Sequence, residues 1–294
     1  MNLGLYPINY QASLGEDFSE YEFNSHGIPL TRFERRPDWQ HNPITVCQYA
    51  LHHFNRYWRE KLSRSKEIFL NQANWLAQNA EDGPSNSKVW YYRIAIPLYG
   101  ITPRWISGMA QGEALSVLLR AHQLTNDPIF LDTAIGAMKI FSVKVQEGGV
   151  IASFPDGRPI IEEYPSPHFM TGVLNGFIFA MFGVYEYARY LDDPHASELF
   201  SQLSNSLRAN LQRYDAGFWS YYDQHASHRL ASRAYHRLHI EQLKRLAELT
   251  GEPVFHNYEL RWRTYINSNY CQLRWLLSKI RQKWQMKFRS IAEI

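Results

Sequence analysis

Apolar residues recur at intervals of three and four from residue 44 onward, which is the period of an amphipathic helix. In the first such stretch the recurring residues are Val46, Tyr49, Ala50, His53, Phe54, Tyr57 and Trp58. A second stretch with the same period runs from residue 66 to residue 78. The pattern therefore predicts a first pair of helices in this region.

Three short polar segments that end in proline divide the rest of the pattern: residues 125–128, 191–194 and 250–253. A polar side chain can cap the start of a helix, and proline is favoured at the first helical position. Each segment is therefore predicted to be a tight turn between two helices. The flanking helices are expected at residues 112–124 and 129–145, 171–191 and 195–211, and 240–249 and 254–266.

Four helix hairpins in succession predict a mainly α fold, an incomplete α/α toroid (barrel) with short β-hairpin insertions. Residues 107–112 have the small side chains expected where an inner helix begins. Residues 148–164 and 218–222 interrupt the helical period and are predicted as short strands, with a hairpin turn at residues 155–159.

The two ends of the chain differ from this helical region. Residues 1–42 lack a helical period and are predicted as a loop-rich arm, with a hairpin at residues 23–28. Residues 268–294 are predicted as a basic amphipathic helix, which is usually the solvated face of a packed terminal helix. Such a helix can also contact an anionic polysaccharide, a membrane surface or a partner helix. The helical domain is therefore expected at residues 43–267.

Composition indicates a globular protein without a strong overall field. Of the 294 residues, 45% are apolar and 20% are charged, which is enough for one large buried core. The 31 basic and 28 acidic residues leave a net charge of +3, too small to indicate a nucleic-acid partner. Cys47 and Cys271 have no metal-ligand spacing and are expected to be buried thiols.

The sequence contains no evident targeting or membrane signal. The first residues have no basic segment followed by an apolar run, so no signal peptide is predicted. The longest apolar stretch, residues 176–188, contains Glu186 and is too short to span a bilayer. We therefore expect no membrane span and, by default, a cytoplasmic protein.

A pair of carboxylates followed by a phenol and a proline stands out at residues 161–165. Proline favours an extended backbone at the residue before it, and neighbours in an extended chain point to opposite sides. Glu162 and Glu163 are therefore predicted on opposite faces, one in a cleft and the other in solvent. Without further context, such a pair is usually just solvated.

Several segments together resemble the C-terminal domain of the D-glucuronyl C5-epimerases, in order and in approximate spacing. They are residues 105–114, 162–165, 173–177, 214–215, 222–223 and 235–240. The resemblance extends from residue 85 to residue 265. It implies a partial α/α barrel that converts glucuronic acid to iduronic acid residues in heparosan-like chains. The implied reaction is a reversible two-base proton transfer at C5, with no cofactor and no metal.

Carried over by position, the resemblance implies catalytic roles for Glu163, Tyr164, Tyr222 and Tyr235, which are expected to line one cleft. The positions implied to contact substrate are Asn175, His236, Met109, Gln111 and His225. The implied partner is an anionic polysaccharide that contains uronate. A homodimer is left open, and no nucleic acid is expected.

The implied chemistry explains the residue types. Removing a proton next to a carboxylate adds negative charge to an anionic group, so a base alone is not sufficient. General acid–base assistance supplies about 10² to 10⁴ in rate, and the remainder needs donors aimed at the developing enediolate. A tyrosine is protonated at neutral pH, which suits Tyr164 and Tyr222 as donors to the sugar carboxylate. Inversion needs a proton-transfer group on each face of the ring, Glu163 on one and Tyr235 on the other.

The chain departs from the family pattern just after residues 222–223. An arginine expected there is absent, and Gln224 and His225 stand in its place. This difference affects the identity of the polysaccharide more than the type of reaction. His236 and His239 have a spacing that can hold a metal, but no third ligand lies at a useful spacing, so no metal site is predicted.

Three other functions fit the same residues. A polysaccharide lyase begins with the same deprotonation and then expels the substituent at C4. A glycoside hydrolase needs a second carboxylate across the scissile bond from Glu163, and the sequence indicates none. A non-catalytic toroid would only bind acidic sugar chains.

Overall fold

The computed structural model of the chain describes residues 2–10, 21–33 and 39–292, and in the last helix it describes side chains as far as Gln282. The chain forms two compact units. Unit 1 contains Met1–Met170 and Gly176–Leu203, and unit 2 contains Thr171–Asn175 and Ser204–Ile294. Residues 43–267 contribute to both units.

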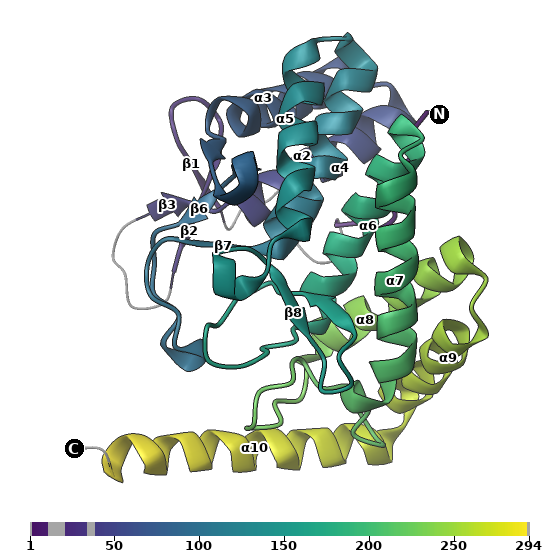
Figure 1. Cartoon of the computed structure of the whole chain (residues 1–294). Helices are drawn as coiled ribbons and strands as arrows, with labels where there is room; N and C mark the ends of the chain where they lie inside the picture. Colours follow the sequence, from purple (N-terminus) through teal and green to yellow (C-terminus); the bar gives the residue numbers. More distant parts are fainter. Residues whose placement is uncertain (1, 11–20, 34–38, 293–294) are drawn as a thin grey trace. The chain divides into compact units, whose positions relative to one another are not determined.

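Consecutive helix pairs make up most of unit 1, and Figure 1 shows their order along the chain. The first pair is α2 (Pro43–Glu60) with α3 (Ser63–Gln78), and the second is α4 (Gly108–Thr125) with α5 (Pro128–Met138). The third is α6 (Leu174–Leu191) with α7 (Pro194–Asn210), of which residues 176–203 belong to unit 1. Within unit 1 the rings of Tyr185 and Phe200 join this third pair at 5.0 Å. The mainly helical fold class and the predicted helix hairpins are confirmed.

The turn between α4 and α5 has the predicted local cause. Asn126 adopts a left-handed conformation with φ of 57°, which ends α4. The carboxylate of Asp127 accepts a hydrogen bond of 3.0 Å from the Ile129 amide, and Pro128 is the first residue of α5. The two helices are thus joined by residues that suit a stop and a start.

The helices α4 and α6 are the inner helices of unit 1. Every residue from Gly108 to Ala121, and from Gly176 to Val184, is buried. Their backbones approach so closely that a Cβ atom on Gly112 would lie 3.0 Å from the carbonyl oxygen of Ala180. By contrast, α3 and α5 bury only one face. Buried inner helices shielded by one-sided outer helices are the packing predicted for an α/α toroid.

The strands are short and form antiparallel hairpins. The first sheet has the order β1 (Glu22–Phe23), β2 (Pro29–Arg32) and β3 (Trp39–His41). Two more pairs are β4 (Glu81–Asp82) with β5 (Lys88–Val89), and β6 (Tyr91–Tyr92) with β7 (Trp105–Ile106). The last pair is β8 (Ile151–Ser153) with β9 (Pro159–Ile161), in which Ala152 lies opposite Ile160. The hairpins predicted near residues 23–28 and 155–159 are confirmed.

Short 3-10 helices occupy Pro84–Asn86, Pro97–Tyr99, Lys139–Ser142, Val145–Glu147 and Leu211–Tyr214.

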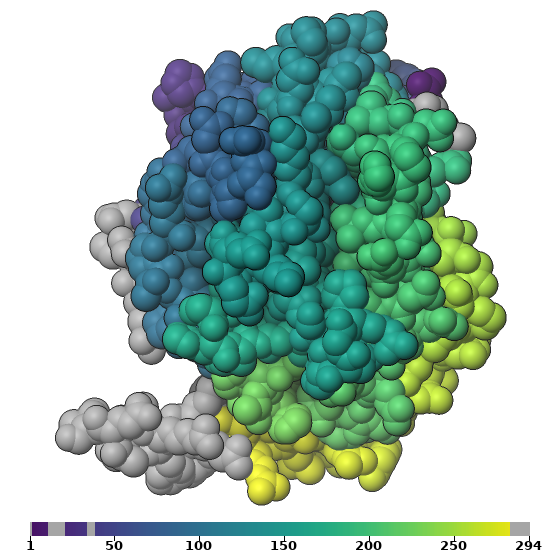
Figure 2. Space-filling model, in the orientation of Figure 1, coloured from purple at the N-terminus to yellow at the C-terminus, as the bar shows by residue number. Residues whose placement is uncertain are grey.

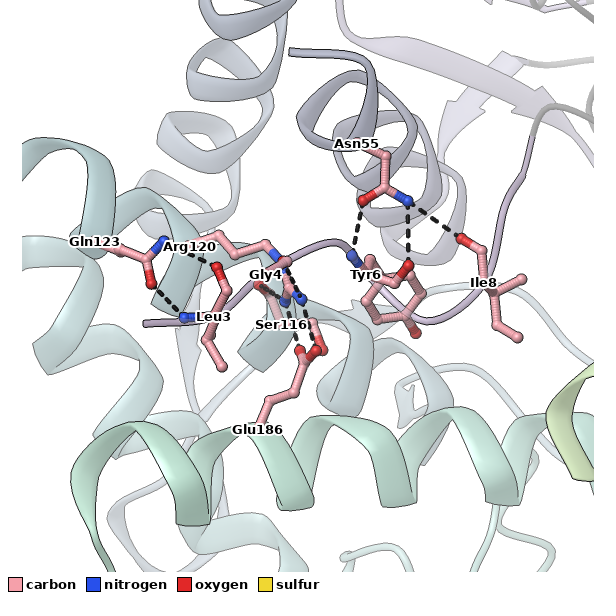
Figure 3. Close-up of polar contacts among 9 residues, drawn as sticks. All are labelled: Leu3, Gly4, Tyr6, Ile8, Asn55, Ser116, Arg120, Gln123 and Glu186. Atoms are coloured by element: carbon pink, nitrogen blue, oxygen red, sulfur yellow. Dashed lines mark hydrogen bonds and ion pairs between the residues drawn. The ribbon is translucent and has the colours of Figure 1, made fainter. Parts of the chain in front are cut away.

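The segment of residues 2–10 is irregular but anchored in unit 1, as Figure 3 shows. The side-chain amide of Asn55 on α2 accepts from the Tyr6 amide at 2.7 Å and donates to the Tyr6 carbonyl at 3.2 Å. Gln123 on α4 makes the same pair of contacts with Leu3, at 2.6 and 3.0 Å. The two side-chain amides thus satisfy backbone groups that a neighbouring strand would otherwise pair with, and they help to hold Ile8 and Tyr10 in the core.

Unit 2 contains the helix pair α8 (Arg233–Thr250) and α9 (Pro253–Asn267), followed by α10 (Asn269–Ala292). One face of α10 packs on the unit through Trp275, whose indole donates to the Ala231 carbonyl at 2.9 Å. The opposite face exposes Leu273 and Leu277. The side chains of the basic tail beyond Gln282 lie outside the described residues. Among the described residues, no helix is long and apolar enough to cross a membrane.

Candidate functional site

The two neighbouring carboxylates that follow β9 are both buried, Glu162 with 1% and Glu163 with 4% of their surface exposed. The expectation that one of them faces solvent is therefore wrong. The backbone of Glu162 explains this, because its amide donates to the Val150 carbonyl at 2.8 Å and its carbonyl accepts from the Gly108 amide at 2.9 Å. The start of α4 and the β8–β9 hairpin thus enclose both residues.

The side chain of Glu163 lies against the first turn of α6. A Cβ atom on Gly176 would lie 2.6 Å from the Cβ of Glu163 and 2.9 Å from its carboxyl carbon, and closer still to Oε2. Only glycine permits this approach. The amino end of a helix carries a partial positive charge, which favours a carboxylate at this place. Glu163 is therefore held in one position by the backbone of unit 1.

A third buried carboxyl group, Glu113 of α4, interacts electrostatically with Glu163. Glu113 accepts hydrogen bonds from the Tyr10 hydroxyl and, at 3.3 Å, from the Gln48 amide. Burial raises the pKa of Glu113 to about 8, the two hydrogen bonds oppose this shift, and the charge of Glu163 adds to it. Glu113 is therefore largely protonated at neutral pH, so it does not compete with Glu163 for negative charge.

Aromatic rings surround Tyr164, the next residue along the chain. Its ring centroid lies 5.1 Å from that of Tyr99 and 5.5 Å from that of Trp105. Trp105 in turn stacks on Tyr92 at 4.4 Å, and the Tyr92 hydroxyl donates to the Asn42 side chain at 2.7 Å. This packing fixes the ring of the half-buried phenol.

Met109 and Gln111 lie on the first turns of α4, and both are buried. The amide of Gln111 accepts from the Trp90 backbone amide at 3.3 Å and donates to the Lys88 carbonyl at 3.1 Å. Both ends of this side chain thus hold the strand segment before β6. A substrate contact for either residue stays a prediction.

In unit 2 the structure brings together Tyr222 and Tyr235. Their rings meet edge to face with centroids 4.9 Å apart. Tyr235 is on the first turn of α8, where its amide donates to the capping hydroxyl of Ser232 at 3.1 Å, and 40% of its surface is exposed. The amide of Tyr222 donates to the Arg229 carbonyl at 2.7 Å. One phenol is thus open to solvent and packs on the other.

Arg229 occupies the region from which an arginine was missing in the sequence pattern. Its guanidinium donates to the Asp223 carboxylate through two nitrogens, with Nε at 3.0 Å, and lies 5.2 Å from the centre of the Tyr222 ring. Asp223 is buried. The sequence pattern did not indicate Arg229, because the arginine was expected directly after Asp223 and Arg229 lies six residues further along the chain. The signal that could have found it is the pairing of Tyr222 with Arg229 across a short hairpin.

The other two predicted positions of this unit, His225 and Asn175, differ in their burial. His225 is half-buried, and its Nδ1 lies 2.7 Å from the Ser227 hydroxyl. Asn175 is buried at the start of α6, and its backbone carbonyl accepts from the Gln242 side chain of α8 at 3.0 Å. Substrate contacts for both residues stay predictions.

His236 is fully buried in unit 2. Its ring stacks on Trp219 at 4.1 Å, and its Nδ1 accepts from the Ser220 amide at 3.2 Å. Its Nε2 therefore carries the proton and donates to the Trp262 carbonyl at 3.1 Å. Burial lowers the pKa of His236 to about 4, and the hydrogen bond to Trp262 acts in the opposite direction. This surrounding gives His236 a packing role, and its substrate contact stays a prediction.

His239 shares the same buried hydroxyl. Its Nδ1 lies 2.9 Å from the Ser220 oxygen, which is also 2.7 Å from the Nδ1 of His236. Burial holds the pKa of His239 well below its ordinary value, and a charge on His236 would lower it further. In the described part of the chain, no group of three or more His, Cys, Asp or Glu could hold a metal ion.

Comparison with known proteins gives one family and several relatives. Residues 85–264 match the family described as the D-glucuronyl C5-epimerase C-terminus. The D-glucuronyl C5-epimerase of Caenorhabditis elegans is 32% identical over an alignment of 228 residues, which covers 70% of this chain and 37% of that protein. An uncharacterized protein of Methanocaldococcus jannaschii is 29% identical over an alignment of 248 residues, which covers 76% of this chain and 77% of that protein.

Among solved structures, the unsaturated glucuronyl hydrolase of Bacillus sp. GL1 aligns with a TM-score of 0.49 and 16% identity. The alignment covers 76% of this chain and 60% of the hydrolase.

Proposed function

Because the chain belongs to the D-glucuronyl C5-epimerase family, we propose that it epimerises uronic acid residues at C5 within an acidic polysaccharide. The proposed conversion is from D-glucuronic to L-iduronic acid in heparosan-like chains. The observation that carries the proposal is the family match, which includes Glu163, Tyr164, Tyr222 and Tyr235. The chain spans 37% of the length of the nematode enzyme, so its activity and its substrate are both part of the proposal.

In the proposed mechanism Glu163 removes the C5 proton from one face of the sugar, and Tyr235 delivers a proton from the other face. Support for Glu163 as the base comes from its fixed contact with Gly176 and from a neutral Glu113 nearby. Support for Tyr235 as the acid comes from the exposure of its ring at the start of α8. The reverse reaction exchanges the two roles.

Tyr164 and Tyr222 are proposed to donate hydrogen bonds to the sugar carboxylate while charge develops on it. Removing one oxyanion donor from an enzyme lowers the rate by about 10² to 10³, and each tyrosine is expected to contribute a similar factor. The Arg229 guanidinium over the Tyr222 ring supports this role, because a nearby cation favours negative charge on the bound carboxylate.

The test is incubation of heparosan with the protein in deuterium oxide, with C5 followed by NMR. Deuterium at C5 together with iduronate signals is the expected result, and an unsaturated cleavage product would indicate a lyase instead. Two variants separate the bases. Glu163→Gln should abolish inversion and keep exchange only from the epimer whose proton faces Tyr235, and Tyr235→Phe should show the opposite preference. Full inversion activity in Glu163→Gln would contradict the mechanism.

A further inference from the structure

Unit 1 contains a cavity of about 390 Å³ that none of the predicted site residues lines. Its walls come from three segments: residues 144–146, 151–153 and 166–170. The middle segment is strand β8, and the last one follows Tyr164 directly along the chain. Figure 2 shows these segments in teal. The cavity is therefore built from the same hairpin and loop that position Glu163.

The lining of this cavity combines polar and apolar side chains and has no negative side chain among its described residues. Lys144 and His168 supply nitrogen groups that can donate hydrogen bonds, and Ser153 and Ser166 supply hydroxyls. Phe169, with 41% of its surface exposed, supplies an aromatic ring. Within the described parts of the chain the Lys144 ammonium forms no ion pair. A lysine without an acidic partner favours an anionic ligand.

The backbone holds the two nitrogen-bearing residues in place. The carbonyl of Lys144 accepts from the amides of Glu147 and Gly149, both at 2.9 Å, and Lys144 also bridges to Ile151 of β8. The amide of His168 donates to the Ser166 hydroxyl at 3.2 Å. Its ring packs on Gly100, where φ is +65° and an added Cβ would lie 2.9 Å from the His168 Cδ2. Because the backbones of Lys144 and His168 are fixed by these contacts, the cavity is preorganised.

The cavity lies close to Glu163 along the chain. Ser166 is three residues after Glu163, and its amide donates to the Tyr164 carbonyl at 2.9 Å. Three residues of fully extended chain span about 10 Å at most. The cavity is therefore close enough to Glu163 to hold one sugar of a polymer while Glu163 is proposed to act on another sugar of the same polymer.

We propose that this cavity is a second sugar subsite, which binds another uronate of the same polysaccharide chain. The Lys144 ammonium and the His168 ring bind its carboxylate, the two serine hydroxyls bind ring hydroxyls, and Phe169 packs on the sugar face. The identity of the polymer rests on the proposed function, whereas the preference of the cavity for a carboxylate-bearing sugar rests on its lining. An exposed charge pair of this kind changes affinity by about fivefold.

The test is calorimetric binding of a heparosan decasaccharide to the full chain and to two matched lysine variants. Lys144→Gln should weaken binding about fivefold. Lys139→Gln, an exposed lysine that does not line the cavity, should leave binding unchanged. His168→Gln provides a second variant in the cavity and should also weaken binding. Equal affinities for Lys144→Gln and Lys139→Gln would overturn the proposal.

A carboxyl-reduced decasaccharide, in which each uronate is a neutral sugar, completes the test as a double-mutant cycle. The loss caused by Lys144→Gln should disappear with this ligand, and an unchanged loss would contradict carboxylate recognition. Failure of the proposed function has a different signature. Suppose that heparosan shows no deuterium at C5 but the Lys144 effect depends on the carboxylate. This result would support the subsite and contradict the proposed epimerase activity. Normal deuterium exchange at C5 without an effect of Lys144→Gln on binding would support the epimerase activity and contradict the subsite.

Discussion

The carboxylate of Glu163 rests directly on the backbone of Gly176, so that the position of the proposed base depends on the absence of a single side chain. Both residues belong to unit 1, and both are buried. A buried side chain in contact with helix backbone has little room to change its rotamer. The contact therefore links a glycine of α6 to the proposed base just after β9.

The first prediction follows from this contact. In Gly176→Ala the new methyl group would displace Glu163, and C5 exchange should fall about 100-fold, as expected for a misplaced catalytic group. Alanine favours a helix over glycine by about 1 kcal/mol, so helix propensity gives no reason for unfolding. Activity and thermal unfolding are measured together. Gly4→Ala, where an added Cβ meets nothing within 4 Å, is the control. Normal exchange in Gly176→Ala would show that Glu163 is not held this way.

The second prediction concerns Arg229. Arg229→Lys keeps a positive charge for Asp223 but loses the planar group over Tyr222, and C5 exchange should fall about fivefold. Arg261→Lys is a matched control in the same unit, because Arg261 also pairs with an aspartate, Asp215, and lies 4.9 Å from a tyrosine ring centre. The two variants are compared by their exchange rates on heparosan. Equal rates in both would remove the proposed role of Arg229.

The third prediction concerns the buried ion pair in Figure 3. Arg120 donates to both oxygens of Glu186, at 2.5 and 2.6 Å, and both residues are buried. Removing one partner leaves a buried charge, so Glu186→Gln should lower the free energy of unfolding by about 3 to 5 kcal/mol in urea titrations. Glu60→Gln breaks the exposed pair with Arg56 and should cost less than about 1 kcal/mol. Similar costs for both variants would contradict the importance of burial.

The fourth prediction concerns acid stability. The pKa of His236 is about 4 in the folded protein, against 6.5 as its ordinary value. The unfolded chain therefore binds a proton first, and stability should fall as the pH drops from about 6.5 to about 4, by on the order of 3 kcal/mol. His236→Gln should weaken this pH dependence in urea unfolding, although the variant is less stable at neutral pH. His256→Gln, which changes an exposed histidine, should not weaken it.

The fifth prediction concerns the alkaline side. Glu113 has a pKa of about 8 in the folded protein and an ordinary value of 4.5. The folded state holds this proton longer than the unfolded state, so its contribution to stability declines as the pH rises from about 4.5 to about 8. At about pH 9, Glu113→Gln should be more stable than the wild type by on the order of 4 kcal/mol, and at about pH 4 the two should be similar. Unfolding titrations at both pH values check this, with the exposed Glu147→Gln as control.

The helix pairs could be predicted from the sequence because their causes are local. At the α4–α5 turn, Asn126, Asp127 and Pro128 act within a few residues of their own position. The β8–β9 turn is local in the same way, since Gly157 supplies the positive φ of 82° that the turn requires. Periodicity and capping depend on neighbours along the chain, and these neighbours are visible in any sequence.

The surroundings of the candidate site depended on contacts between distant residues. Tyr10 reaches Glu113 across 103 positions, although its segment was expected only to be a loop-rich arm. Glu162 is buried because α4 covers it, His236 because Trp219 and Trp262 enclose it.

The sequence by itself therefore determined the helix pairs, the short hairpins and the residue types that can carry out proton transfer. The tertiary structure decided which carboxyl group keeps its proton, which glycine supports Glu163, and that Arg229 reaches Asp223. The physical reason is that burial and pKa depend on the groups packed around a side chain. Packing joins residues that no local pattern connects.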